Sequence, residues 1–137
     1  MFLGEYFHSL DGKSRVVMPS GFRRRLEDGC VLTKGQDRQL VLFPSAEFEA
    51  RAAEVTEMEQ NRTGRRFSRT VFSGAGLQAL DKSGRVLIKP DLRDFADLET
   101  GSEIAVIGVY DHVELWNKAL YLEDRAAGDQ TYLEEDE

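Results

Sequence analysis

The chain has 137 residues, 41% of them hydrophobic, which is enough for one compact domain or two small ones that share a core. No apolar run approaches the roughly 20 residues that span a bilayer, and the single cysteine cannot form a disulfide within the chain. We therefore expect a cytoplasmic protein with no membrane partner. The net charge of −7 argues against binding to nucleic acid, but residues 61–93 carry eight Lys and Arg against two acidic residues, so a basic surface can exist locally.

The first predicted elements surround a tight turn. A short strand leads into Asp11-Gly12-Lys13-Ser14-Arg15, where Gly12 is expected to supply the permissive backbone. Three further elements are predicted behind this turn: a strand over residues 15–18, a brief helix over residues 20–26, and a hairpin of residues 30–34 and 39–43.

The middle of the chain is predicted to be helical. Ser45 is a plausible N-cap, and Phe48, Ala52 and Val55 fall on one face of the helix behind it. Four arginines then recur at the spacing of one helical face: Arg62, Arg65, Arg66 and Arg69. This stripe either follows DNA phosphates or pairs with the glutamates of the preceding helix, in the same subunit or the next. The nearby glutamates favour the pairing.

The elements around the first turn recur in the second half of the chain. Residues 80–89, Leu-Asp-Lys-Ser-Gly-Arg-Val-Leu-Ile-Lys, repeat the order of apolar, turn and charged positions found in residues 10–19. Gly84 is the expected permissive residue of this second turn. The repeat predicts a strand over residues 85–88, a helix over 91–96, and a hairpin of 103–109 and 113–116.

Several motifs together resemble the MraZ family of AbrB-like swapped-hairpin barrels. They are Met1-Phe2-Leu3-Gly4-Glu5-Tyr6, the two Asp-x-x-x-Arg turns, Phe72-Ser73-Gly74-Ala75, and Ile107-Gly108-Val109 with Glu114-Leu115-Trp116. The resemblance implies an α+β fold, mostly β: a duplicated swapped-hairpin β-barrel with connecting helices. We expect a first repeat over 1–47, a helical connector over 48–75, a second repeat over 76–119, and a short helix with an acidic mobile tail over 120–137.

The same resemblance implies a sequence-specific DNA-binding transcriptional regulator associated with the nucleoid. It is expected to repress the cell-division and cell-wall gene cluster, including its own gene, and to bind short direct repeats as a ring-like homo-oligomer. Two positions depart from the family pattern. Ser14 stands where Gly is common, and Lys89 where Pro is common.

The two Asp-x-x-x-Arg turns supply the candidate DNA-binding residues. Arg15 and Arg85 have the planar fork that suits guanine O6 and N7. Asp11 and Asp81 are expected to hold the loops and orient the arginines. Lys13 and Lys82 are expected to contact phosphates, and the set is completed by Ser14 and Ser83. Arg23 and Arg93 are expected to pair with acidic neighbours instead.

One alternative of a different class stays open: an oligomeric protein-interaction or antitoxin-like module on the same fold. An enzyme is not expected, because no nucleophile, nucleotide loop or paired carboxylates can be placed from the sequence. His8 and His112 are far apart, so we expect no metal, and we expect no cofactor or small-molecule substrate.

Overall fold

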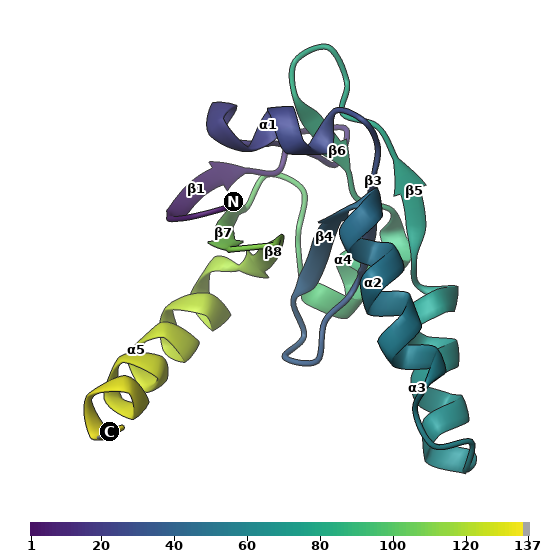
Figure 1. Ribbon diagram of the computed structural model, residues 1–137. Coiled ribbons are helices and arrows are strands. Elements are labelled where there is room, and N and C mark those ends of the chain that lie inside the picture. Colours follow the sequence, from purple (N-terminus) through teal and green to yellow (C-terminus); the bar gives the residue numbers. More distant parts are fainter. Residues whose placement is uncertain (136–137) are drawn as a thin grey trace.

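Over residues 1–135, which the computed structural model describes, eight strands and five helices follow one another in two similar series (Figure 1). The first series is β1 (Glu5–Ser9), β2 (Arg15–Val17), α1 (Ser20–Leu26), β3 (Cys30–Lys34) and β4 (Leu40–Pro44). The second is β5 (Gly76–Gln78), β6 (Arg85–Leu87), α4 (Pro90–Ala96), β7 (Glu103–Val109) and β8 (His112–Asn117). Helices α2 (Ser45–Thr56) and α3 (Arg62–Ser73) connect the two series, and α5 (Lys118–Glu134) follows them.

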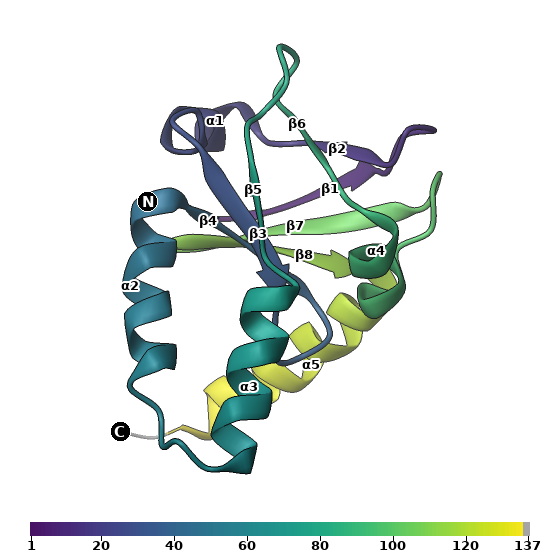
Figure 2. The same ribbon diagram turned by 90° about the vertical axis from the view of Figure 1, so that its right-hand side faces the viewer.

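The two halves exchange strands. One antiparallel sheet has six strands in the order β1-β7-β8-β4-β3-β5, and a second has the two strands β2 and β6 (Figures 1 and 2). The order is symmetric, since β1 of the first half pairs with β7 of the second, and β5 of the second half pairs with β3 of the first. Strands β4 and β8 meet in the middle. This exchange confirms the predicted α+β, duplicated swapped-hairpin fold.

A single core fills the space between the sheets and the short helices. Its largest members are inaccessible to solvent and come from both halves: Phe2, Leu10, Leu32, Leu42, Ile104 and Leu115. Strand β3 is buried on both faces, because α2 and α3 cover the side that turns away from the core. The hydroxyl of Thr33, itself 3% exposed, fastens α3 to this strand by donating to the Val71 carbonyl at 2.8 Å. With one core shared in this way, we expect the halves to fold together.

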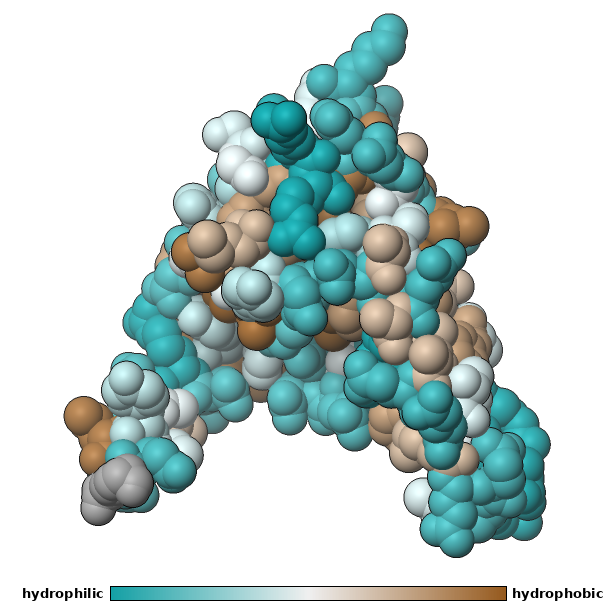
Figure 3. Space-filling view, in the orientation of Figure 1, coloured by the Kyte–Doolittle hydropathy of each residue, from teal (hydrophilic) through white to brown (hydrophobic). Residues whose placement is uncertain are grey.

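Two helical arms extend from the sheet. The α2–α3 hairpin forms one and α5 forms the other, with a hollow between them (Figures 1 and 3). Asn117 caps α5 by accepting the Leu120 N–H at 3.0 Å, and the first turns rest on β7 and β8. Glu5 of β1 accepts a hydrogen bond from the Tyr121 hydroxyl at 2.6 Å and pairs with Arg125. From Glu123 onward every described side chain of the helix is exposed.

The carboxyl end differs from the short helix and mobile tail expected over residues 120–137. Helix α5 continues through Glu134, because the N-cap and the packed first turns nucleate it and Ala, Gln, Leu and Glu propagate it. Residues 136 and 137 of the expected tail lie outside the described part of the chain. The prediction that Ser45 caps α2 is also wrong. Ser45 is the first helical residue behind Pro44, and its side chain makes no capping hydrogen bond.

Within residues 1–135, none of the helices combines the length and the apolar character that a membrane crossing demands.

Candidate nucleic-acid interface

The β2–β6 ladder brings the two Asp-x-x-x-Arg loops together. Arg15 lies opposite Leu87, and Arg85 lies opposite Val17. Two backbone hydrogen bonds extend the ladder into the loops. The Ile88 N–H donates to the Ser14 carbonyl at 2.9 Å, and the Met18 N–H donates to the Gly84 carbonyl at 2.8 Å. Each loop is therefore tied to the strand end of the other half.

Both aspartates hold their loops in the same way. One oxygen of Asp11 accepts the backbone N–H groups of Lys13 and Arg15, each at 2.9 Å, and the other accepts Arg15 Nε at 2.9 Å. Asp81 accepts the backbone N–H groups of Ser83 and Arg85, each at 2.9 Å, and Arg85 Nε at 2.7 Å. This is the arrangement expected of an aspartate that shapes a loop and orients an arginine. Contact between these loops and DNA stays a prediction.

The pKa values of both carboxyls reflect these bonds. Desolvation raises the pKa of Asp11, but the N–H groups of Arg15 and Lys13 and the guanidinium of Arg15 outweigh it and hold the pKa below its usual value. The backbone N–H of Arg85 is the largest influence on Asp81, and it lowers that pKa against a smaller desolvation effect. Both carboxylates are therefore ionised at neutral pH and can orient their arginines.

The four charged groups form one cluster across the pseudo-twofold axis. Arg15 Nη1 lies 3.9 Å from Asp81 Oδ2, and Arg85 Nη1 lies 3.9 Å from Asp11 Oδ2. The side chains are 26–35% exposed, so the cluster lies at the surface without projecting freely. Each guanidinium is fixed through Nε. Within the described residues neither arginine donates a hydrogen bond through an Nη atom, so those N–H groups are available to a ligand.

The turn chemistry of the first loop differs from the prediction. Ser14, not Gly12, takes the left-handed conformation with φ of +63°, and Gly84 takes it in the second loop with φ of +76°. These two residues are equivalent because each directly precedes the arginine. Counting back from the arginines would have shown this, and it also shows that Lys13 matches Ser83, while Lys82 matches Gly12. Lys13, Lys82 and Ser83 are exposed beside the cluster.

Arg23 and Arg93 support the loops, a role that the sequence analysis missed. Arg23 Nε donates to the Met18 carbonyl at 3.0 Å, and Arg93 Nε donates to the Ile88 carbonyl at 3.1 Å. The expected ion pairs with acidic neighbours are absent among the described residues, because a carbonyl at the end of each short strand takes the Nε–H instead. The guanidinium of Arg23 also packs on Gly84 of the other half. The matching of Phe22-Arg23 with Leu92-Arg93 was the signal for this pair.

The arginine stripe lies along α3, in an arm that extends away from the β5–β6 loop (Figure 2). Within residues 1–135 its members form no ion pair with the glutamates of α2, so the expected pairing inside one subunit is wrong. Arg65 Nη1 instead donates to the Gln60 carbonyl at 3.0 Å. Phe48 packs on Phe72 and Arg51 lies over Phe67, so ring contacts of these side chains join α2 to α3. Pairing with a second subunit stays open.

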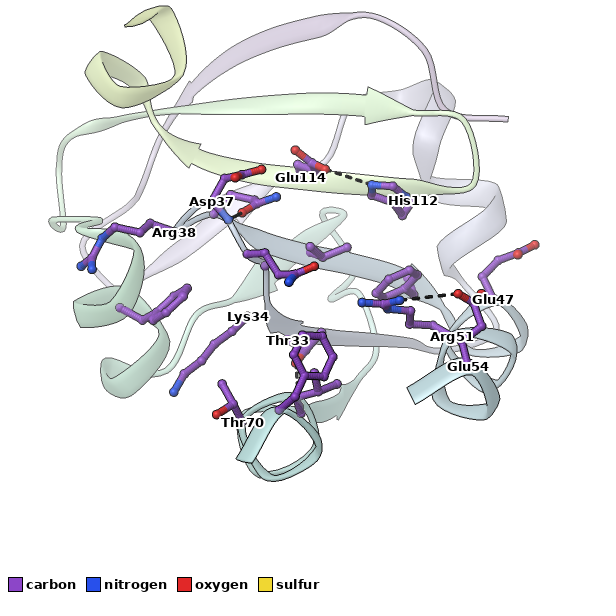
Figure 4. A pocket seen from close by; sticks show the side chains of 18 of the residues that line it. Thr33, Lys34, Asp37, Arg38, Glu47, Arg51, Glu54, Thr70, His112 and Glu114 are labelled. Carbon is purple, nitrogen blue, oxygen red and sulfur yellow. Dashed lines mark hydrogen bonds and ion pairs between the residues drawn. The ribbon is translucent and has the colours of Figure 1, made fainter. Parts of the chain in front are cut away.

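A groove of about 790 Å³ opens between α2, α3, the β3–β4 turn and β8 (Figure 4). On its β8 side, His112 contacts Asp111 at 2.7 Å and Glu114 at 3.0 Å, and Glu114 also accepts the Trp116 Nε1–H at 2.9 Å. The hydrogen bond to Glu114 raises the pKa of His112 above its ordinary value, against a smaller desolvation effect. This network was not predicted from the sequence, where His112 was considered only as a histidine far from His8.

Comparisons with known proteins agree with the duplication. Residues 1–70 and 71–127 each match the family described as "MraZ protein, putative antitoxin-like". The chain is 42% identical over 119 residues to a protein of Finegoldia magna named transcriptional regulator MraZ, covering 86% of this chain and 82% of that protein. Proteins of the same name from Nocardioides sp. and Clostridium acetobutylicum are 42% and 40% identical over 138 and 124 residues. These alignments cover 99% and 90% of this chain, and 94% and 86% of the two relatives.

Proposed function

The chain belongs to the MraZ family, and on that premise we propose that it is a transcriptional regulator that reads DNA with its paired loops. The observation that carries the proposal is the surface cluster of Arg15 and Arg85, each fixed through Nε by an aspartate. A guanidinium held in this way loses little freedom on binding, and its outward N–H groups match guanine O6 and N7.

The neighbouring side chains suit the edge of such a contact. Lys13 and Lys82 are exposed on the two loops and would neutralise phosphates on either side. Ser14 and Ser83 would add hydrogen bonds there. Much of the chain's negative charge does not oppose this approach, because α5 and its acidic residues point away from the β5–β6 loop (Figure 1). The field at the loops is local, since salt screens charges beyond about 8–10 Å.

One copy offers only two reading arginines, so its footprint and affinity are small. Repeated sites on DNA and repeated subunits would multiply that affinity without any new kind of contact. We therefore include in the proposal a ring-like homo-oligomer that binds short direct repeats. Its targets would be the promoter of the cell-division and cell-wall gene cluster, with its own gene, in the cytoplasm at the nucleoid, and its output repression.

The test compares Arg15→Ala and Arg85→Ala, singly and together, with Arg24→Ala, an exposed arginine of α1 outside the cluster. Fluorescence anisotropy on a DNA duplex from the chain's own promoter would measure affinity across a salt series. Each loop variant is expected to lose roughly 10- to 100-fold in specific affinity, since a bidentate guanine contact is worth about 1–3 kcal/mol. Circular dichroism and oligomer size should stay unchanged. If the Arg15→Ala/Arg85→Ala protein binds this duplex as tightly as the Arg24→Ala protein, the two loops do not recognise the DNA sequence.

A protein-interaction or antitoxin-like role is the second candidate. The exposed end of α5 favours it, because Tyr132 and Leu133 are 81% and 78% exposed. This reading predicts a stable complex with a separate protein that is lost when both residues are replaced by Ser, together with no enrichment of any promoter in immunoprecipitated DNA. Promoter enrichment would decide for the regulator.

A further inference from the structure

We propose that the outer half of α5 from one copy of this chain docks into the groove between α2 and α3 of a second copy. The inference rests on the homo-oligomer of the proposed function and names the surfaces that join it. It does not depend on which residues contact DNA.

Helix α5 is poorly supported within its own chain. Its first turns are held by Asn117 and Glu5, but from Glu123 onward each described side chain is exposed. An isolated helical stretch of this length is marginal in water. Gly128 weakens it further, by about 1 kcal/mol relative to Ala, and nothing in the described part of the chain lies close enough to require a glycine there. A helix of this kind gains most of its stability from packing against another surface.

The exposed half of α5 ends in two large apolar side chains, Tyr132 and Leu133. Leu133 lies at i+7 from Ala126 and therefore on the same side of the helix, and Tyr132 lies beside it. Acidic residues surround this side of the helix: Glu123, Asp124, Asp129 and Glu134. The exposed part of α5 is thus mainly acidic and ends in apolar side chains.

The groove combines apolar side chains with charges of both signs, and the adjoining face of α3 is cationic. Its floor and walls include Val41, Phe43, Phe67, Val71 and Phe95. Its lining carries four cationic side chains, Lys34, Arg38, Arg51 and Arg66, and five carboxylates, Asp37, Glu47, Glu54, Asp111 and Glu114. Figure 4 shows Lys34, Arg38 and Arg51 among the labelled side chains that line it. The adjoining face of α3 adds two exposed arginines, Arg62 and Arg69.

Three arginines on this face of α3 have no acidic partner in the described part of their own chain. Within residues 1–135 there is no ion pair to Arg62, Arg66 or Arg69, although each is exposed. Acidic side chains of an incoming α5 would supply those partners while Tyr132 and Leu133 enter the groove. Charge complementarity of this kind sets the register and orientation of a contact.

The occupant must come from another molecule. In Figures 1 and 3 the α5 arm and the α2–α3 arm diverge from opposite sides of the sheet, so α5 does not reach its own groove. The two surfaces are unlike, and a contact between unlike surfaces continues from copy to copy until a ring closes. The loops at the other end of the molecule stay uncovered.

The test uses two full-length variants. The groove variant is Arg62→Glu/Arg66→Glu/Arg69→Glu, and the helix variant is Tyr132→Ser/Leu133→Ser; all five side chains are exposed, so the fold should persist. Arg24→Glu on α1 and Asp28→Arg are charge controls at exposed positions away from the groove. Light scattering after size exclusion measures mass, and anisotropy on a single DNA site measures binding.

We expect the parent and both controls to form the oligomer and each variant alone to be a monomer, with subunit affinity lowered by roughly a hundredfold or more. Mixed in equal amounts, the variants should form a one-to-one dimer and nothing larger, because the intact helix of one fits the intact groove of the other. A monomeric parent, an unchanged oligomer in either variant, or a mixture that stays monomeric would overturn the proposal.

Binding to a single DNA site separates this failure from failure of the proposed function. Dissociated variants should keep the parent's affinity for one site, since their loops are intact. If the groove variant instead keeps its mass and loses single-site affinity, the stripe contacts DNA and the docking proposal is wrong. If the parent assembles as expected but binds no DNA, docking stands and the regulator proposal fails.

Discussion

Gly84→Ala should weaken the contacts that hold the two Asp-x-x-x-Arg loops together. Gly84 has φ of +76°, and a Cβ built on it would lie 2.3 Å from Arg23 Nε. The added methyl therefore meets two costs at once. It places a side chain in the left-handed region, and it pushes away the guanidinium that donates to the Met18 carbonyl at 3.0 Å.

The magnitude follows from these two costs. The left-handed conformation costs a non-glycine residue roughly 1–2 kcal/mol. Loss of the Arg23 hydrogen bond costs about 1 kcal/mol more, and the stiffer unfolded chain returns about 0.5–1 kcal/mol. We expect a net loss of about 2 kcal/mol in the free energy of unfolding, with the melting temperature lowered by roughly 6 °C. Urea denaturation followed by circular dichroism would measure it.

Ser14 provides the matched control, because it occupies the equivalent position with φ of +63°. Ser14→Gly removes a similar strain but adds backbone entropy to the unfolded state, and it forfeits the 3.3 Å contact of the hydroxyl with Thr100. These effects offset one another, so the change should stay within about 0.5 kcal/mol. If Gly84→Ala unfolds at the same urea concentration as the parent, the close approach of Arg23 does not constrain this loop and the reasoning is refuted.

Three further predictions concern groups away from the loops. Burial raises the pKa of the Cys30 thiol to about 11, so the folded protein should react with a thiol reagent at pH 8 far more slowly than the urea-unfolded protein; equal rates would contradict this. His112→Gln should destabilise the fold most in acid. The hydrogen bond to Glu114 raises the pKa of His112 above its ordinary 6.5, so protonated His112 stabilises the fold fully below pH 6.5 and progressively less as the pH rises through the folded-state pKa. Melting curves across pH measure this, and a loss of stability that grows toward pH 8.5 would refute it. Thr33→Val should cost about 1–3 kcal/mol in urea denaturation, because it leaves the Val71 carbonyl buried without its 2.8 Å donor, and a change below 0.5 kcal/mol would show that solvent replaces that donor.

Local patterns were enough to predict most of the elements. The enrichment of the hairpins in Val, Ile, Leu and aromatic residues predicts strands. The spacing of Phe48, Ala52 and Val55 follows the 3.6-residue period that helix geometry imposes. The duplication added the strongest inference, since two copies of one pattern predict two equivalent loops. For the same reason the paired aspartates and arginines could be chosen as candidates before any distance was known.

What the sequence by itself determined is the kind of each element and the twofold pattern of its turns, because both depend on neighbours along the chain. Only the tertiary structure decided which strands pair, that Arg23 supports the loop of the other half, and that the pKa of His112 responds to Glu114. The same holds for the groove and for the exposed half of α5, neither of which any local propensity encodes. These features depend on the register of β2 against β6 and of β4 against β8, where residues far apart in the chain come within hydrogen-bonding distance only after the shared core has formed.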